Sequence, residues 1–220
     1  GDANTFVGDN AGGATTTADS NTAVGASALL VNSTGASNVA IGYQSLTANT
    51  TANQNVAVGR ATLATNTTGA DNTAIGQAAL NANTTASNNT AVGSQALTAN
   101  TTGTANTAVG YGSLDANTTA NSNTAIGKDA LTANTTGTRN VAVGASALQT
   151  ITTASYNTGV GNDVLGANTT GANNVGVGDQ ALGANTTGAG NTAVGKSAGA
   201  AVTTGSNNTI VGKLAGDAIT

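Results

Sequence analysis

The sequence predicts an all-β fold, a parallel β-solenoid built from 17-residue coils. A five-residue pattern, Asn-x-x-(Val/Ile)-Gly, recurs every 17 residues without insertion or deletion. Each copy alternates β-branched residues with a small one, and its Gly, Thr, Val and Asn disfavour helix interiors. We therefore expect a single repeat domain, 1–220, whose thirteen coils span 4–220 and begin at Asn4, Asn21, Asn38, Asn55, Asn72, Asn89, Asn106, Asn123, Asn140, Asn157, Asn174, Asn191 and Asn208.

Composition favours a thin, ordered body. Of the 220 residues, 6% are charged and 2% are aromatic, so large apolar side chains are too few for a thick globular core. The net charge of −4 and the absence of Pro argue against disorder. With about 4.8 Å between stacked strands, twelve steps predict a rod of about 60 Å.

The first residues of each copy predict a short strand. Counting the Asn as repeat position 1, position 2 is Thr or Val and position 4 is Val or Ile, which is a period of two. We expect this branched face, for example Val56 and Val58, to point into the coil. Ala57, between them, should lie on the opposite face and permit close approach by a neighbouring chain. The invariant Gly at position 5 predicts a sharp corner.

Later positions predict stacked columns. Asn fills position 12 in most copies, and stacked Asn side chains can hydrogen-bond along a column, as can those at position 1. Thr or Ser at position 13 and Thr at position 14 predict a second extended stretch, closed by Gly or Ala at position 15. In the third copy the structural positions are Asn38, Val39, Ile41, Gly42, Leu46, Asn49 and Thr51. Leu forms a column at position 9, comprising Leu29, Leu46, Leu63, Leu80, Leu97, Leu114, Leu131, Leu148, Leu165 and Leu182.

Two further patterns concern variation between copies. Charged residues within the repeats fall only at positions 6, 7, 10, 16 and 17, which we expect to face water. Position 15 alternates between Ala and Gly from Ala18 to Gly171, which suggests a larger unit of two coils. The sequence offers no structural reason for this alternation.

At Asn38-Val-Ala-Ile-Gly42 and its equivalents, the chain resembles the head repeats of trimeric autotransporter adhesins. Longer units such as Asn106-Thr-Ala-Val-Gly-Tyr-Gly-Ser-Leu-Asp-Ala-Asn-Thr-Thr118 are also similar to shaft repeats of bacteriophage tail fibres. The resemblance covers 4–220 and implies a left-handed β-roll packed as a homotrimeric attachment fibre. The unit is longer than the commonest adhesin head repeat and carries Leu where small residues are more usual, which predicts a different cross-section.

The residue types argue against a catalytic, metal-binding or nucleic-acid-binding site. His, Cys and Glu are absent, so no thiolate or His-based nucleophile or metal site can form within the chain. Calcium β-roll motifs need Asp in every glycine turn, whereas position 6 is Asp only at Asp9 and Asp179. The acidic balance and the lack of a stacking platform disfavour nucleic acid. We expect no enzyme activity, no cofactor, no metal and no nucleic-acid partner.

These observations favour a structural role. We expect a shaft of an extracellular trimeric fibre, on a virion tail or a cell surface, that mediates attachment. No apolar run is long enough for a membrane span. The chain lacks Met and ends mid-repeat at Thr220, so we expect a fragment of a longer fibre protein whose missing tip would bind a host receptor or surface glycan. The alternative is an ice- or carbohydrate-binding solenoid that uses the repeated Thr columns.

Overall fold

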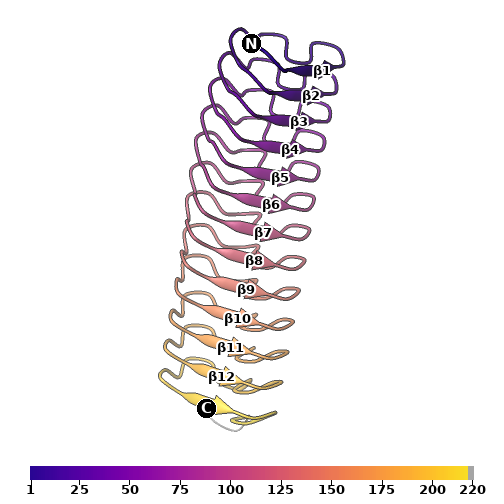
Figure 1. Cartoon of the computed structure of the whole chain (residues 1–220). Coiled ribbons are helices and arrows are strands. Elements are labelled where there is room, and N and C mark those ends of the chain that lie inside the picture. Colours follow the sequence, from indigo (N-terminus) through magenta and orange to yellow (C-terminus); the bar gives the residue numbers. More distant parts are fainter. Residues whose placement is uncertain (218–220) are drawn as a thin grey trace. The chain divides into compact units, whose positions relative to one another are not determined.

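The computed structural model describes residues 1–217 and confirms a parallel β-solenoid with a 17-residue period (Figure 1). The described residues contain no helix, and therefore none long and apolar enough to cross a membrane. Each coil contributes one three-residue strand. The strands are β1 (Thr5–Val7), β2 (Thr22–Val24), β3 (Val39–Ile41), β4 (Val56–Val58), β5 (Thr73–Ile75), β6 (Thr90–Val92), β7 (Thr107–Val109), β8 (Thr124–Ile126), β9 (Val141–Val143), β10 (Thr158–Val160), β11 (Val175–Val177), β12 (Thr192–Val194) and β13 (Thr209–Val211).

The chain divides into two compact units, Gly1–Asn106 with β1 to β6 and Thr107–Thr220 with β7 to β13. Within each unit every strand pairs in parallel with the strand of the following coil, at a register shift of one repeat. Val39, for example, lies opposite Val56. Equivalent residues therefore form columns, as the sequence predicted.

The predicted orientation of the strands is wrong. The middle residue of the strand is buried, as at Ala40 and Ala57, which are both 0% exposed. The branched residues face outward: Val39 is half-buried and Ile41 is 39% exposed. The same pattern holds in β2 to β12, so the small position faces the interior and the β-branched positions face the surface.

The width of the coil explains this reversal. The Leu side chains at position 9 are fully buried and fill the space opposite the strand. At Gly159, in the middle of β10, an added Cβ would collide with the Leu148 side chain of the preceding coil. An interior this narrow accepts Ala or Gly from the strand and excludes Val or Ile, because close-packed cores tolerate little extra volume.

Where position 9 lacks its Leu, a large residue at position 3 of the strand fills the space instead. In the first coil, position 9 is Gly12, and the Phe6 ring from β1 occupies the space where a Cβ would project, 2.6 Å away. Near the other end, position 9 is Gly199, and Ile210 Cδ1 of β13 lies 2.9 Å from a Cβ placed there. Each large strand residue thus packs against a glycine that replaces the usual Leu, so the total side-chain volume is kept.

The Leu column is built on unusual backbone. Leu46 has φ of 52° and Leu80 has φ of 50°, and the other position-9 leucines have similar values. Positions 7 and 17 also adopt positive φ in successive coils, as at Gln44 and Ser37. Each such residue costs about 1–2 kcal/mol relative to right-handed backbone. Hydrogen bonds between coils offset this cost, for example Leu46 N–H to Thr62 O at 2.9 Å.

Glycine is required at the corner after the strand. Gly42 has φ of 130°, and an added Cβ would lie 2.5 Å from the carbonyl oxygen of Gly59 in the next coil. The predicted corner is therefore confirmed, with both torsion and stacking as its causes. The predicted second extended stretch is wrong, because positions 13 and 14, such as Thr50 and Thr51, form a bend. Thr50 is half-buried and its hydroxyl donates to Thr67 O at 3.1 Å, whereas Thr51 is exposed.

Two buried Asn ladders occupy the other half of the interior and confirm the prediction. At position 1, Asn38 N–H donates to Asn21 Oδ1 at 2.9 Å, and its Nδ2 donates to Ala52 O at 2.8 Å across the same coil. At position 12, Asn49 Nδ2 donates to Asn32 Oδ1 and to the same Ala52 O, at 2.9 and 3.0 Å. Both Asn side chains of one coil therefore converge on one carbonyl oxygen.

Position 15 lies at this point of convergence, which explains the residue alternation in part. Ala52 and Ala86 are buried, each 2% exposed. At Gly35 and Gly69, an added Cβ would collide with the carbonyl oxygens of Ala52 and Ala86 in the following coils. Glycine is thus a steric requirement on these coils.

Candidate interaction surface

Because the coils repeat, the surface consists of columns, each made of one repeat position. The outer face of the sheet carries positions 2 and 4. Position 4 is Val or Ile in every coil, and these side chains remain half-buried or exposed, as at Ile75 (41% exposed) and Ile126 (40% exposed). Contiguous exposed apolar surface of this kind is typical of an interaction site.

A second column consists of Thr at position 14. These side chains are exposed in every coil that has this position: Thr17, Thr34, Thr51, Thr68, Thr85, Thr102, Thr119, Thr136, Thr153, Thr170, Thr187 and Thr204. The adjacent position 13 differs, because its hydroxyl donates to the next coil, as Thr50 Oγ1 does to Thr67 O at 3.1 Å. The position-14 side chains are therefore exposed in every coil, whereas the position-13 hydroxyl is used in a hydrogen bond to the next coil.

Charged side chains cluster at the corner after the strand, where positions 6, 7 and 10 meet. Lys128 Nζ lies 2.9 Å from Asp129 Oδ2. This hydrogen bond and the opposite charge raise the pKa of Lys128. Burial, and secondly the negative charge of Asp129, raises the pKa of Asp115 above its usual value. No charged side chain is fully buried in residues 1–217, as the sequence predicted.

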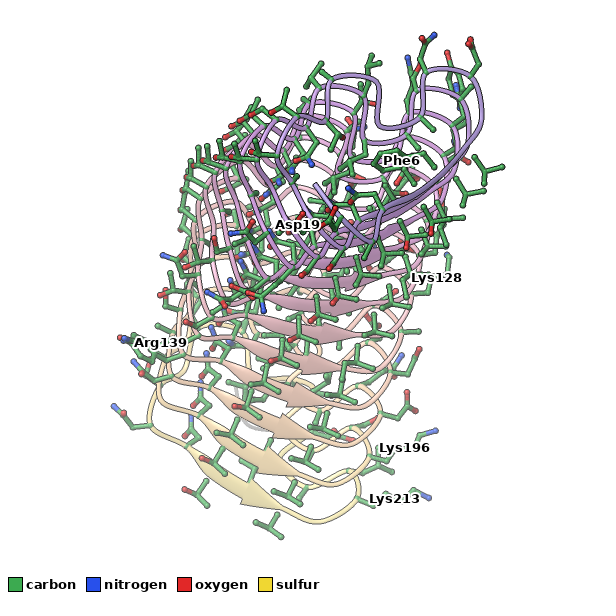
Figure 2. The ribbon with its side chains drawn as sticks, turned by 45° about the horizontal axis from the view of Figure 1, so that its top comes forward. Phe6, Asp19, Lys128, Arg139, Lys196 and Lys213 are labelled. Atoms are coloured by element: carbon green, nitrogen blue, oxygen red, sulfur yellow. The ribbon has the colours of Figure 1, made fainter. Side chains whose placement is uncertain are left out.

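One aromatic contact stands out at position 17 of two successive coils. The Arg139 guanidinium lies 5.4 Å from the centre of the Tyr156 ring, and its Nη1 donates to the Tyr156 hydroxyl at 2.5 Å. Both side chains are exposed, and Arg139 projects from the edge of the coils in Figure 2. An exposed contact of this type contributes about 0.5–1 kcal/mol.

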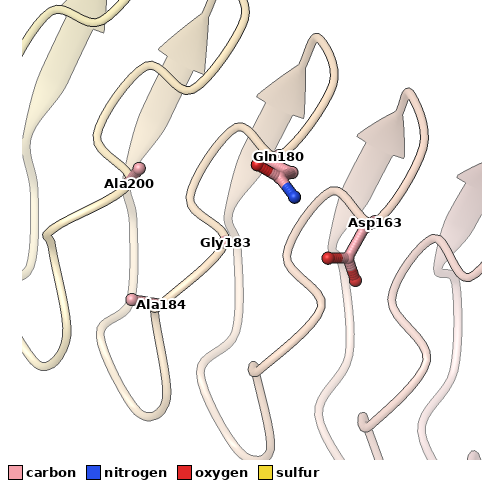
Figure 3. A pocket seen from close by; sticks show the side chains of 5 residues that line it. All are labelled: Asp163, Gln180, Gly183, Ala184 and Ala200. Carbon is pink, nitrogen blue, oxygen red and sulfur yellow. The ribbon is translucent and has the colours of Figure 1, made fainter.

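A shallow hollow of about 240 Å³ lies in the second unit (Figure 3). It is lined by Asp163, Gln180, Gly183, Ala184 and Ala200. It forms because position 10 carries Gly or Ala in this region, so that no side chain fills the space between successive coils. Only Asp163 and Gln180 contribute polar side-chain groups, and the lining contains no aromatic ring.

The described residues 1–217 contain no group of three or more His, Cys, Asp or Glu side chains close enough to hold a metal ion. Asp residues meet on neighbouring coils at two places: Asp115 lies close enough to Asp129 to be affected by its charge, and Asp2 N–H donates to Asp19 Oδ1 at 2.6 Å.

The structural positions predicted in the third copy fall into two groups. Asn38, Leu46 and Asn49 are buried in the interior, and Gly42 forms the corner. Val39, Ile41 and Thr51 lie on the surface instead. The sequence reasoning therefore missed the apolar outer face, although the invariant Val or Ile at position 4 was its signal.

Comparisons with known proteins identify no family for this chain. A scan against protein-family models, a search of curated proteins and a search of solved structures each found no match.

Proposed function

We propose that this chain is a non-enzymatic structural segment of an extracellular homotrimeric fibre, in which the outer sheet faces of three chains pack together. The observation that carries the proposal is the column of Val and Ile at position 4, whose side chains are half-buried or exposed along both units. The resemblance to adhesin heads and phage fibre shafts supports the left-handed winding, the trimer, and a position on a virion tail or cell surface. A tip outside this chain would bind the receptor or glycan.

The repeat itself supports a partner of the same sequence. A column with one Val or Ile per coil matches another column only where the rise per coil is the same, and a second copy meets this condition along its whole length. Packing removes these side chains from water at about 25 cal/mol per Å² of apolar surface. Position 2, which is Thr or Val, contributes further branched side chains to the same face.

The test is the mass in solution by light scattering coupled to size exclusion. We expect about three times the 20.6 kDa of one chain, with a β-rich circular dichroism spectrum. The double variant Ile75→Lys/Ile126→Lys should give a folded monomer, because two charges would enter the apolar interface. A matched control, Thr85→Lys/Thr136→Lys, places the same charges on the same two coils in the Thr column and should remain trimeric. A β-rich monomer of the unmodified chain would contradict the proposal.

A second candidate function has its own observation. The exposed Thr column at position 14 presents one hydroxyl and one methyl group per coil at a constant spacing, which suits binding to ice or to an ordered carbohydrate surface. Thermal hysteresis of the unmodified chain that disappears in Thr85→Lys/Thr136→Lys would support this function. An unchanged freezing point and no retention on crystalline polysaccharide would leave the column without this role.

A further inference from the structure

The three tyrosines of the chain share one feature. Each lies 17 residues from a Lys or Arg, so the two residues occupy the same repeat position on successive coils. The pairs are Tyr43 with Arg60, Tyr111 with Lys128, and Tyr156 with Arg139. Every Tyr therefore has a cationic residue next to it in its column, although the chain has only five Lys and Arg residues in total.

In two of these pairs the cation already has a partner within the chain. Lys128 Nζ, next to Tyr111, lies 2.9 Å from Asp129 Oδ2. The Arg139 guanidinium lies over the Tyr156 ring and donates to its hydroxyl. Neither pair therefore presents a cation that is free to bind an anion.

The pair of Tyr43 and Arg60 differs from the other two. Tyr43 is 50% exposed, and Arg60 is also exposed. In the described part of the chain, Arg60 forms no ion pair and does not lie over the Tyr43 ring. Both the guanidinium and the aromatic ring are therefore available to a ligand.

The positive charge of Arg60 also lies in a region with few other charges. Between residues 21 and 105, the one other charged residue is Asp71, at position 17. Positions 6 and 17 lie at opposite ends of the strand, as Lys128 and Arg139 show in Figure 2. An anion that approaches Arg60 from the position-6 edge therefore meets no carboxylate of these coils.

Two exposed amides extend this pair along the same corner of the coils. Gln77 is at position 6 of the coil after Arg60, and Gln44 is at position 7, directly after Tyr43. Each amide provides both donors and an acceptor. With about 4.8 Å between stacked coils, Tyr43, Arg60 and Gln77 form a row about 10 Å long. We call Tyr43, Gln44, Arg60 and Gln77 the corner patch.

The backbone beneath the corner patch is fixed by hydrogen bonds between coils. Ala61 N–H donates to Tyr43 O at 2.9 Å, and Ala78 N–H donates to Arg60 O at 3.0 Å. These bonds hold the three coils of the patch at a constant spacing. A ligand therefore has to order only side chains, which lowers the entropic cost of binding.

We propose that the corner patch binds an acidic polysaccharide, one whose sugar units carry carboxylate groups. The Arg60 guanidinium can pair with one sugar carboxylate through two parallel N–H···O bonds. The Tyr43 ring can pack against the apolar C–H face of a pyranose ring. The amides of Gln44 and Gln77 can form hydrogen bonds with sugar hydroxyl groups on either side.

The composition of the corner patch favours a polysaccharide over a nucleic acid. Nucleic acids carry one phosphate per nucleotide and are bound by tracks of several cations. The corner patch contains one cation, and the chain has a net charge of −4. Two amides beside a single guanidinium match a ligand that has several hydroxyl groups for each charge.

This site is separate from the contact proposed for the trimer. The trimer contact uses positions 2 and 4 on the outer face of the sheet, whereas the corner patch uses positions 6 and 7, beyond the glycine corner. Polysaccharide binding and solution mass are therefore independent measurements, and the failure of one proposal does not imply the failure of the other.

The test is biolayer interferometry of the full chain on immobilised polygalacturonate, whose sugar units carry carboxylates. Immobilised amylose serves as the neutral surface and single-stranded DNA as the phosphate surface. We expect binding to polygalacturonate that weakens at high salt, and none to amylose. Arg60→Gln should raise the Kd about tenfold and Tyr43→Ser about fivefold, because each removes one main contact.

The matched controls are Lys128→Gln and Tyr111→Ser, which make equivalent changes at position 6 where the cation is already paired. Both should leave the Kd unchanged, and circular dichroism should show that all four variants are folded. Equal losses from Arg60→Gln and Lys128→Gln would overturn the proposal, since a general charge effect would then be the cause. No binding to polygalacturonate, or binding to single-stranded DNA alone, would also overturn it.

Discussion

The two halves of each coil interior follow different rules. In the apolar half, made of positions 3, 8 and 9, residues exchange volume with their neighbours: Phe6 stands beside Gly12, and Ile210 beside Gly199. In the Asn half, made of positions 1, 12 and 15, individual hydrogen bonds decide which residue fits. Apolar packing depends on total volume and shape, whereas a buried polar group needs its partner.

The two Asn columns also differ from one another. Position 1 is Asn in every coil, but position 12 changes to Ile151 and Val202. Where this happens, Asn134 Oδ1 and Asn185 Oδ1 of the preceding coils are buried without a hydrogen bond. Position 1 bonds the backbone N–H of the next coil as well as side chains, so its loss would leave a buried backbone group unpaired. Replacing the Asn at position 12 leaves only the Oδ1 atom of the preceding Asn without a hydrogen bond.

The largest effect should come from the apolar half. Leu80→Ala removes a fully buried side chain that no neighbour can replace, and should lower the free energy of unfolding by about 3 kcal/mol. This loss is measured from denaturant unfolding curves that are recorded by circular dichroism at matched protein concentration. A loss below that of Thr85→Ala, an exposed substitution in the same coil, would contradict the Leu column as the main apolar contact.

A somewhat smaller effect should separate the two Asn columns. Asn72→Ala removes the acceptor of Asn89 N–H (3.0 Å) and should cost about 2.5 kcal/mol. Asn66→Ala removes the acceptor of Asn83 Nδ2, which still donates to Ala86 O at 3.0 Å, and should cost about 1 kcal/mol. Both are measured by the same unfolding curves. Equal losses would mean that the backbone bond does not distinguish the columns.

Volume exchange can be tested where Gly176 faces Val164. A Cβ on Gly176 would lie 2.6 Å from Val164 Cγ2, so Gly176→Ala should cost about 1.5 kcal/mol. In the Val164→Ala background, the same substitution should cost almost nothing, because the methyl group enters the vacated space. A double-mutant cycle measures this coupling, and additive losses would argue against it.

The smallest effect should arise where the Asn ladder is interrupted. Ile151→Asn should supply a donor to Asn134 Oδ1 and so offset much of the apolar burial that is lost, with a net change below about 1 kcal/mol. Leu148→Asn, in the apolar half of the same coil, has no such compensation and should lower the unfolding midpoint far more. Similar unfolding midpoints for Ile151→Asn and Leu148→Asn would contradict the claim that the Asn half and the apolar half of the coil follow different rules.

Much of this fold could be predicted from the sequence, for a physical reason. A strict period with no insertions requires equivalent residues to stack, so the coil length, the parallel pairing, the Leu column and both Asn ladders follow from the repeat alone. The corner at Gly42 could also be predicted, because glycine at the same place in every coil indicates a conformation that a Cβ would oppose.

Only the tertiary structure decided which face of the strand points inward. A period of two assigns positions 2 and 4 to one face and position 3 to the other, but it is symmetric with respect to inside and outside. The width of the interior removes the symmetry, because the Leu side chain from the opposite wall leaves room for Ala57 and none for Val56 or Val58. That width depends on the path of the whole coil, including its left-handed residues at positions 7, 9 and 17, which no local pattern specifies.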